Sequence, residues 1–500
     1  MQDRFRAAER WTRAALIALA ISGCTLGPNF KRPEAPNVTG YSAQSLPGAT
    51  VETQVAGGGA QHFTVGKKIE QQWWTLFHSE PLNQLIQAAL RDSPNVAAAQ
   101  ASLRQARETL AAGRGTLWPS VTAQAGATRE REQAALLGLT TGGDFEFNLF
   151  NAGVDVSYPF DLFGGIRRQL ESLQAQVDDQ ALQVEATYLS LTSNVVTAAI
   201  QAASLRAQLS ATRDIEALEM RQVDVVQRRF SLGAVPKSDV LSQKTQLAQT
   251  HATVPSLERQ LALAEDQLAI YAGRFPAEGG VPTFELDALE LPTDLPVSVP
   301  SELVHQRPDI LAAEALLHSA SAQIGVATAN QYPSLTLTGA LTLDAFKLKD
   351  LVEKSAFGWS LGANLTAPIF NGGALAAKKR AAIAAYDQAA ASYRQTVLQA
   401  FGNVADALRA LDADARALQA QVDAQDQARA ELDLAQKQFG AGALSQLQLL
   451  TAQQQFQQTR IAVIQLQASR YADTAALFAA LGGGWWSRDT PAGGPAAANP

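Results

Sequence analysis

The sequence predicts a mainly α-helical protein in which one module, made of very long helices and a β-hairpin, occurs twice. One helical run opens at Pro94 and ends in Trp118-Pro119-Ser120, and a second opens at Pro308 and ends in Tyr332-Pro333-Ser334. Long stretches between these signals contain almost no Gly or Pro, which favours helices over compact lobes. The offset of about 210 residues is much longer than a solenoid repeat, so it indicates duplication of a whole module.

The first part of the chain resembles a secretory signal peptide that covers residues 1–23. Basic residues precede an apolar stretch from Ala14 to Ile21, and Cys24, the single cysteine, follows at the cleavage point. This arrangement is similar to a bacterial lipobox, so we expect Cys24 to be acylated and to anchor the chain to lipid. Thr25 follows instead of Asp, which by resemblance to lipoprotein sorting favours the outer membrane. The alternative is an ordinary signal peptide with an incidental cysteine.

Composition argues against nucleic-acid binding and against enzymatic chemistry. The formal net charge is −7, and no basic stripe accompanies it. The five histidines share no spacing that would place two of them on one helix face; they are His62, His78, His251, His305 and His318. We find no metal-ligand cluster, nucleophile elbow or phosphate loop. The sequence therefore predicts neither a catalytic residue nor a metal or other cofactor.

Two very long helices are predicted, at 165–232 and 373–440, because these stretches lack Pro and keep apolar residues at three- and four-residue steps. A spacing near 3.5 indicates coiled-coil packing. About 68 residues at about 1.5 Å each give about 100 Å. Gly233 and Gly442 are expected to end these helices as C-cap glycines. Shorter return helices are expected at 236–272 and 444–481.

Strand periodicity follows each of the two Pro-Ser sequences. In 334–343, Leu at odd positions alternates with Thr at even positions, and 357–367 alternates likewise. The strands of the first copy change phase, which predicts a β-bulge near residue 150. We therefore expect hairpins at about 120–160 and about 334–368.

The composition of these strands favours a membrane. A strand of about ten residues is about 30 Å long and, when tilted, matches the apolar band of an outer-membrane barrel. No segment after the signal offers the ~20 continuous apolar residues of a spanning helix. Four strands cannot close a barrel, so such a sheet would have to be completed by other copies of the chain. The alternative is two soluble hairpins that cap a helical body.

Several motifs, in order and in duplicate, resemble those of the TolC-type outer membrane factor family, in its NodT-like efflux lipoprotein branch. They are Trp73-Trp74 with Phe77, the Pro94 helix that enters Trp118-Pro119-Ser120, the Pro159–Gly164 and Pro368–Gly373 segments, the Phe-x-x-Gly turns, and Leu481-Gly482-Gly483-Gly484-Trp485. The resemblance covers nearly the whole mature chain. It implies a homotrimer with a twelve-strand membrane β-barrel and a twelve-helix periplasmic tunnel.

The resemblance also implies a function. Such proteins are passive outer-membrane exit ducts of tripartite efflux pumps, and they work with a periplasmic adaptor (membrane fusion) protein and an inner-membrane transporter, here expected to be of the RND type. We expect a lipid-anchored location in the bacterial outer membrane. Two alternatives stay open, namely the duct of a type I protein secretion system and a non-transport coiled-coil lipoprotein of the outer membrane.

The recurring turns are candidate contacts for the adaptor, because they place apolar side chains at the end of a long projection. The residues are Phe230, Leu232 and Gly233 in the first copy and Phe439, Gly442 and Leu444 in the second. The alternative is that these turns are helix caps without a partner.

Asp224 and Asp433 are candidates for a gate. Each lies six residues before the Phe of its turn, so a trimer would carry six carboxylates at one height. Like charges at one level repel each other, which suits a cation-selective constriction that rests closed. The alternative is a pair of aspartates on solvated coiled-coil faces.

The domain organisation follows from these assignments. After the signal peptide, we expect a lipid-anchored extended tether at 24–72 and a first repeat at 73–272, in which Trp73-Trp74 and Phe77 dock their segment onto the helices. A linker or equatorial segment at 273–300 and a second repeat at 301–481 follow. The final residues, 482–500, are expected to form a flexible tail.

Overall fold

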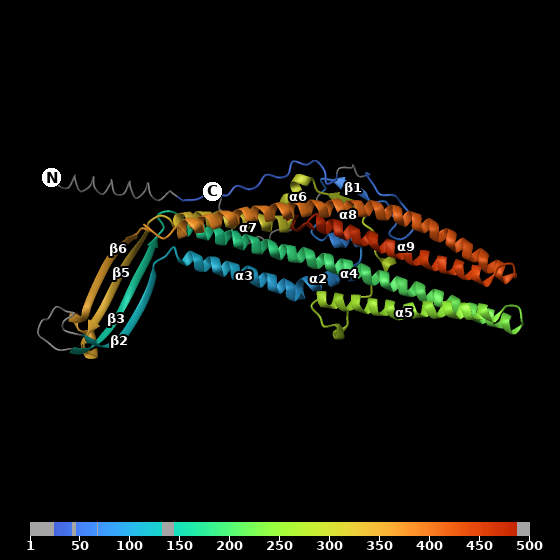
Figure 1. The fold of residues 1–500 in the computed structure, drawn as a ribbon, viewed down its shortest axis with the longest axis horizontal. Helices are drawn as coiled ribbons and strands as arrows, with labels where there is room; N and C mark the ends of the chain where they lie inside the picture. The colour runs from blue at the N-terminus through green and yellow to red at the C-terminus, as the bar shows by residue number, and fades with distance from the viewer. Residues whose placement is uncertain (1–24, 43–46, 68, 133–144, 488–500) are drawn as a thin grey trace. The chain divides into compact units, whose positions relative to one another are not determined.

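The computed structural model describes residues 25–42, 47–67, 69–132 and 145–487 (Figure 1). Its contacts divide the chain into two units. Unit 1 comprises residues 1–33, 102–180 and 312–393, and unit 2 comprises residues 34–101, 181–311 and 394–500. Four helices contribute residues to both units: α3 (Pro94–Gly115), α4 (Gly165–Ser231), α7 (Pro308–Ala329) and α8 (Ala374–Gly440).

The predicted duplication is confirmed by the lengths of the helices. The helices α3 and α7 have 22 residues each, and α4 and α8 have 67 each. The return helices α5 (Lys237–Tyr271) and α9 (Gln446–Ala480) have 35 each. The predicted ends of the long helices lie within one or two residues of the observed ones.

Unit 1 contains an antiparallel sheet with the strand order β2-β3-β5-β6 (Figure 1). Its strands are β2 (Ser120–Glu132), β3 (Phe145–Phe160), β5 (Ser334–Ala345) and β6 (Phe357–Thr366). The two predicted hairpins are therefore confirmed, and the pairing of β3 with β5 joins the two repeats in one sheet.

The predicted β-bulge near residue 150 is wrong. The pairing of β2 with β3 runs without interruption from Ser120 opposite Ser157 to Glu132 opposite Phe145. The change of phase is real in the sequence, but the apolar residues change face instead of the backbone inserting a residue. Phe147 shows how this is accommodated, because its ring packs against Phe346 with centroids 5.6 Å apart.

Unit 2 carries the smaller elements and a buried aromatic core. The strand β1 (His62–Val65) pairs in parallel with β4 (Asp294–Val297), and α2 (Glu80–Asp92) and α6 (Pro300–Gln306) lie in the same unit. Trp73 is stacked on Phe478 of α9 with centroids 5.3 Å apart, and Phe77 lies 6.3 Å from the ring of Tyr471. The prediction that the Trp73-Trp74 segment docks onto the helices is confirmed.

The segment predicted as a tether is extended, but much of it is fixed to unit 2. Arg470 of α9 is fully buried and donates to the backbone oxygens of Gly57, at 2.8 Å, and Gly59, at 3.0 Å. It also donates to Gln61 Oε1 at 3.2 Å. Burial lowers the pKa of Arg470, and carbonyl dipoles rather than a carboxylate supply its partners here. A Cβ on Gly57 would lie 2.8 Å from the Tyr471 ring, so the close approach of this segment to α9 requires glycine there.

The expected flexible tail is wrong for residues 482–487. Gly482, Gly483 and Gly484 are buried and have positive φ angles of 94°, 66° and 74°. A Cβ on Gly484 would lie 2.6 Å from the backbone oxygen of Glu70, so this triplet is a close-packed turn and not a spacer. Trp485 completes the turn by donating its indole N–H to the backbone oxygen of Gln306 at 2.6 Å. Residues 488–500 lie outside the described part of the chain.

One helix of the described residues, α7, is long and apolar enough to cross a membrane by length and composition. A single helix of this kind is weak support for a membrane span, because core helices pass the same test. His318 and Glu314 of this helix form ion pairs with Glu171 and Arg32. These pairs favour α7 as a packed helix of the protein body.

Candidate functional site

The sheet of unit 1 has one face that is apolar along most of its length, with charged side chains only toward the far ends of β2 and β3. Val154 lies opposite Leu341, which lies opposite Trp359, and the same row-by-row pairing repeats along the strands. Leu361 is 80% exposed and Trp359 is 68% exposed. Large apolar residues exposed over a whole sheet face require an apolar environment, so this face is suited to lipid.

The opposite face of the same sheet carries mainly small polar side chains and glycines. Ser157 lies opposite Thr338, which lies opposite Gly362, and Asp155 lies opposite Ala340. Hydroxyl groups, amides and glycines alternate with apolar residues along β5 and β6, as the sequence predicts, whereas β3 changes phase and places Leu149 and Phe147 on this face. A sheet whose exposed face is apolar and whose other face is polar has the pattern of a strand wall between lipid and water.

Within the described residues, the outer strands β2 and β6 each pair on one side only. Their second edges therefore present unpaired backbone N–H and C=O groups. In lipid each unpaired group would cost several kcal/mol, so a single copy of this sheet cannot span a membrane alone.

The two recurring turns have the same backbone geometry at the ends of α4 and α8. Gly233 and Gly442 have φ angles of 73° and 80°. The N–H of Ala234 donates to the Arg229 oxygen at 2.8 Å, and the N–H of Ala443 donates to the Gln438 oxygen at 2.9 Å. Both glycines are therefore C-cap residues in the left-handed region, as predicted.

The side chains of the two turns differ in exposure. Leu232 is 83% exposed and Phe230 is 41% exposed, which agrees with an apolar projection. Phe439 is buried, and Leu444 is partly buried against a cluster that includes Phe439 and Leu449. The premise that Leu444 is exposed like Leu232 is therefore wrong. The reason is that Leu444 packs on a cluster to which both repeats contribute, including Val226 and Val240 of the first repeat.

Arg229 connects the two turns, and sequence reasoning did not single it out. Its guanidinium donates to the backbone oxygens of Phe439, at 2.8 Å, and Gly440, at 3.0 Å. It also lies 4.5 Å from the centroid of the Phe439 ring. The charge thus satisfies carbonyls at the end of α8 and covers the ring. An arginine before Phe230 carries no sequence signal for this role, because the contact joins residues from both repeats.

The two gate candidates lie at equivalent places in the long helices. Asp224 of α4 and Asp433 of α8 are both exposed, and neither forms an ion pair with another described residue. They therefore remain free to face other copies of the chain or solvent. Their role as a gate stays a prediction.

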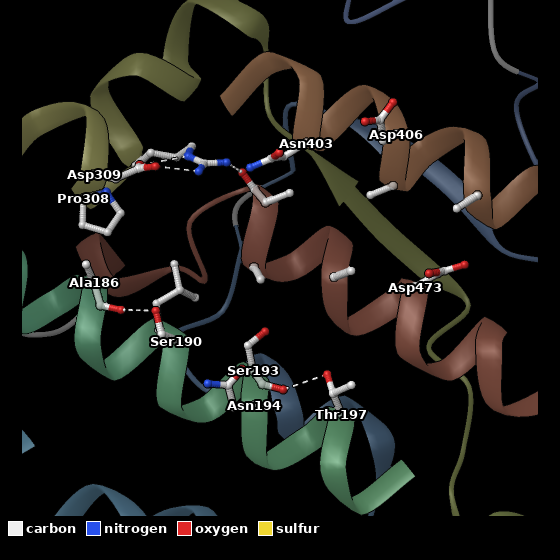
Figure 2. Close-up of a pocket in the computed structure, with 17 residues that line it drawn as sticks. Ala186, Ser190, Ser193, Asn194, Thr197, Pro308, Asp309, Asn403, Asp406 and Asp473 are labelled. Carbon is white, nitrogen blue, oxygen red and sulfur yellow. Dashed lines mark hydrogen bonds and ion pairs between the residues drawn. The ribbon is translucent and has the colours of Figure 1, made fainter. Parts of the chain in front are cut away.

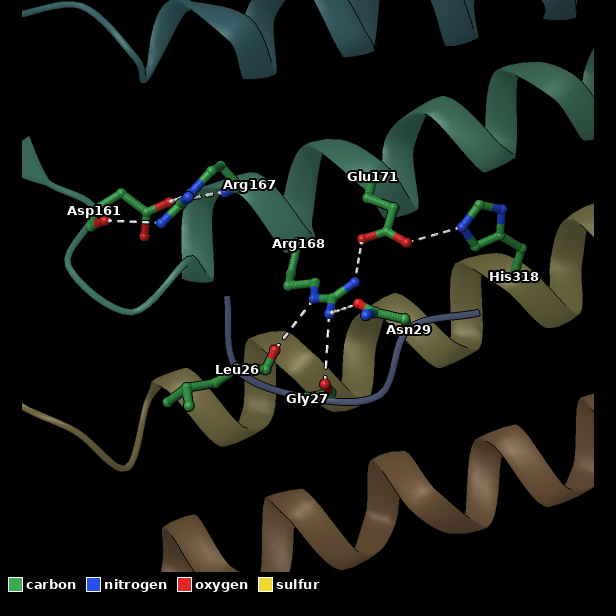
Figure 3. Close-up of polar contacts among 8 residues, drawn as sticks. All are labelled: Leu26, Gly27, Asn29, Asp161, Arg167, Arg168, Glu171 and His318. Atoms are coloured by element: carbon green, nitrogen blue, oxygen red, sulfur yellow. Dashed lines mark hydrogen bonds and ion pairs between the residues drawn. The ribbon is translucent and has the colours of Figure 1, made fainter. Parts of the chain in front are cut away.

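The segment that follows Cys24 is held by a buried arginine (Figure 3). Cys24 itself lies outside the described residues. Arg168 of α4 donates to the backbone oxygen of Leu26 at 3.1 Å and to Asn29 Oδ1 at 2.7 Å. Its third strong partner is Glu171 Oε2, at 2.7 Å. We call this arrangement of Arg168 with Leu26, Gly27 and Asn29 the anchor seat.

The anchor seat also binds α7. The other oxygen of Glu171 lies 2.9 Å from His318 Nε2, and Phe30 stacks on the His318 ring with centroids 4.4 Å apart. Burial would raise the pKa of Glu171, but hydrogen bonds from His318 and Arg168 outweigh it and lower the pKa. A Cβ on Gly27 would clash with Gly325, and a Cβ on Gly325 would lie 2.7 Å from the Arg168 side chain. The chain directly after Cys24 is thus built into the protein body.

Unit 2 contains a cavity of about 630 Å³ between α4, α8 and α9 and the start of α7 (Figure 2). Its polar lining residues are Ser190, Ser193, Asn194, Thr197, Arg307, Asp309, Asn403, Asp406 and Asp473. Arg307 is paired with Asp309 at 2.7 Å and donates to the Ala480 oxygen at 2.7 Å. Burial, followed by the neighbouring Asp414, raises the pKa of Asp473 to about 7.

No group of three or more potential metal-ligating side chains occurs among the residues that the structure describes. The features with a clear physical role are the two-faced sheet, the paired turns and the anchor seat.

Comparisons with known proteins agree on one family. The family model "Outer membrane efflux protein" matches residues 85–274 and 299–483. The chain is 33% identical to the pyoverdine export outer membrane protein OpmQ of Pseudomonas aeruginosa, with 83% of this chain and 88% of OpmQ covered. It is 26% identical to the probable outer membrane lipoprotein SilC of Salmonella typhimurium, with 93% and 96% covered.

A solved structure of the outer-membrane channel OprN superimposes with a TM-score of 0.82 at 28% identity, and covers 92% of this chain and 100% of that chain. The described fold is thus that of known outer-membrane channels. The chain belongs to the outer membrane efflux protein family and is an exit duct of the bacterial outer membrane.

Proposed function

We propose that three copies of the chain form a passive duct through which a pump with a periplasmic adaptor and an RND-type inner-membrane transporter exports small molecules. The observation that carries this proposal is the two-faced sheet with two open edges. Its apolar face is suited to lipid, its polar face to water, and its edges to further copies. The duct has no catalytic role and no resident cofactor in this proposal, because the transporter supplies the energy.

The cargo that we propose is a small organic siderophore of the pyoverdine type. Support comes from OpmQ, which is named for pyoverdine export and is 33% identical to this chain, and from a second OpmQ at 32% identity. Small-molecule drugs are the other candidate, since the name of a relative at 28% identity refers to antibiotic efflux.

Deletion of the gene that encodes this chain, followed by its restoration from a plasmid, tests both the function and the cargo. We expect the deletion strain to accumulate siderophore inside the cells and to release less into the medium, and the plasmid to restore release. Increased antibiotic susceptibility with normal siderophore release would assign the duct to drugs. Neither change in the deletion strain would contradict the proposed pump role.

We propose that the adaptor contacts the exposed parts of the two turns. Leu232 and Phe230 offer the accessible apolar surface, and Gly233 fixes the backbone that presents them. Phe439, Gly442 and Leu444 support the contact indirectly. They form the packed second turn, and the Phe439 backbone oxygen binds Arg229 of the first turn.

We propose that Asp224 and Asp433 form the constriction. Their equivalent positions in the two repeats would give six carboxylates in a trimer, and mutual repulsion favours a ring that attracts cations.

We propose that Cys24 carries the lipid anchor. The resemblance to a lipobox, the similarity to the lipoprotein SilC and the anchor seat directly after Cys24 support this role. Mass spectrometry of protein extracted from membranes should find a mature N-terminus at an acylated Cys24. A mature chain that begins elsewhere, with an unmodified cysteine, would overturn the assignment.

A further inference from the structure

The long helices of the two repeats bury different side chains at one equivalent position. Glu219 of α4 and Ala428 of α8 each lie eleven residues before the Phe of their turn. Both are buried, with exposed fractions of 1% and 4%. Because alanine packs this position in the second repeat, packing alone does not require a carboxyl at the same position in the first.

The carboxyl of Glu219 has too few partners for a buried anion. Its Oε1 accepts a hydrogen bond from Gln246 Nε2 of α5 at 3.2 Å, and its Oε2 has no hydrogen-bond partner among the described residues. The hydroxyl oxygen of Thr250, on the next turn of α5, is also buried and without a partner. A buried carboxylate that no cation balances is strongly unfavourable, so such a group binds a proton instead.

No basic side chain of the described residues pairs with Glu219. Three basic residues of the neighbouring turns pair with other carboxylates: His251 with Glu216, Arg213 with Glu258, and Arg460 with Asp214. Arg221 and Lys244 are exposed, and the face that α8 buries in this region is uncharged.

The charge that does act on Glu219 is negative. Burial raises the pKa of Glu219 above its usual 4.5, the polar groups of Thr250 and Gln246 offset part of this rise, and the charge of Glu216 adds to it. The folded protein therefore holds a proton here that the unfolded chain releases. The stability of this site falls as the pH rises from about 4.5 through the folded-state pKa.

The same carboxyl belongs to a contact between the two repeats. Gln454 of α9 donates to Gln246 Oε1 at 2.5 Å, and Gln246 donates in turn to Glu219. The apolar cluster around Phe439 includes Val226, which lies seven residues, or about 10 Å, further along α4. A charge on Glu219 would thus bring water into a contact between the repeats, close to the cluster that packs their turns.

Resting on the duct proposed above, we infer that Glu219 is a proton-binding site that regulates the duct. With the proton bound, the neutral carboxyl donates to Thr250 and accepts from Gln246, so α4, α5 and α9 stay packed. When the proton leaves, the buried carboxylate draws in water, and the turn ends of the two repeats loosen from each other. The duct is therefore held shut more firmly in acid than at higher pH.

Hydrogen exchange of the full-length trimer in detergent, measured by mass spectrometry, tests the proton site. The wild type is compared at each pH with Glu219→Gln, which resembles the protonated carboxyl, so that intrinsic exchange rates and all other titrating groups cancel. The backbone of α4 and α5 around Glu219 should exchange equally in the two proteins at about pH 4.5, and at least about threefold faster in the wild type at about pH 8.5. Equal exchange at both pH values would overturn the site.

Two further variants keep this test decisive. Glu219→Ala gives the first repeat the residue of the second, so it should assemble and lack the response to pH even if Glu219→Gln does not fold. Glu258→Gln is the matched control, because it neutralises an exposed carboxylate on α5 that pairs with Arg213, and it should keep the wild-type response. A response that persists in Glu219→Ala, or that Glu258→Gln abolishes, would also contradict the assignment.

Single-channel recordings separate regulation of the duct from the proton site itself. Raising the pH from about 5 to about 8.5 should increase the opening frequency at least about threefold more in wild-type trimers than in Glu219→Gln trimers. Equal increases would overturn the regulation. Intact trimers that pass no current, in the wild type and in every variant, would contradict the duct proposed above, whereas the proton site is decided by the exchange experiment alone.

Discussion

At the scale of single residues, buried charges hold segments that hydrophobic patterning cannot place. Arg168 and Arg470 bind backbone carbonyls from distant parts of the sequence. Nothing in the local sequence distinguishes these arginines from exposed ones, because their partners are oxygens that every residue possesses. Cys24, in contrast, stands out in the sequence because its position after an apolar stretch is a local signal.

Replacement of Arg168 by Met should release the anchor seat. Each hydrogen bond to this buried cation contributes about 1.5–3 kcal/mol, so their loss should expose the backbone around Lys31. Limited trypsin digestion of membrane-embedded protein should then cut after Lys31 at least about ten times faster than in the wild type. Arg206→Met is the matched control, because Arg206 of the same helix donates to Glu265 and to the backbone oxygen of Phe284. Equal rates for Arg168→Met and this control would refute the seat.

Replacement of Asp473 by Asn should remove a pH dependence of stability. The folded-state pKa of about 7 lies above the usual 3.8, so the folded protein holds more protons than the unfolded chain between these values. Wild-type stability should therefore fall as the pH rises from about 4 to about 7, by on the order of 1 kcal/mol after solvent screening.

Thermal melts of the detergent-solubilised protein across this range measure the effect. The Asp473→Asn protein should show a smaller decline and a higher melting temperature at neutral pH than the wild type. Parallel curves for the two proteins would contradict a raised pKa at Asp473.

At the scale of elements, periodicity and end signals predicted the helices and hairpins of the two repeats but not β1, β4 or α6. The long helices were predictable because α4 and α8 lack Pro over 67 residues and end at glycines. The unbroken pairing of β3 was not predictable, because a change of apolar phase in the sequence has two physical solutions and only the pairing partners choose between them. Likewise, the triplet at Gly482 gave no sign of the close contact with Glu70 that keeps it rigid.

A charged residue at the first turn should block the pump without preventing assembly. Leu232→Glu places a carboxylate on a side chain that is 83% exposed, so the fold and the trimer should persist while the apolar contact with the adaptor is lost. Siderophore or drug export should fall to the level of the deletion strain, with normal trimer on gels.

Leu444→Glu is the contrasting variant, because Leu444 packs against the cluster around Phe439. A buried carboxylate there should destabilise the helix ends and lower the amount of trimer. Normal export by the Leu232→Glu variant would show that the first turn is a helix cap and does not contact the adaptor.

At the scale of the whole molecule, duplication is the organising fact. One module supplies both hairpins and both long helices, so the chain repeats one set of contacts and leaves its two sheet edges for further copies. The sequence could predict this arrangement because the repeated signals are local. It could not predict which side chains of the two turns are exposed, since Phe439 and Leu232 differ through contacts between the repeats.

Single-channel recording in planar lipid bilayers tests the central claim that the chain is a passive duct. Purified trimers should give discrete, cation-selective current steps without any added energy source. The double variant Asp224→Ala with Asp433→Ala should show weaker cation selectivity or a leakier resting state, whereas Glu431→Ala, on the same helix but two residues from Asp433, should resemble the wild type. Wild-type behaviour of the double variant would show that the two aspartates lie on a solvated helix face and do not form a gate. The absence of current steps from preparations that contain intact trimers would contradict the duct itself.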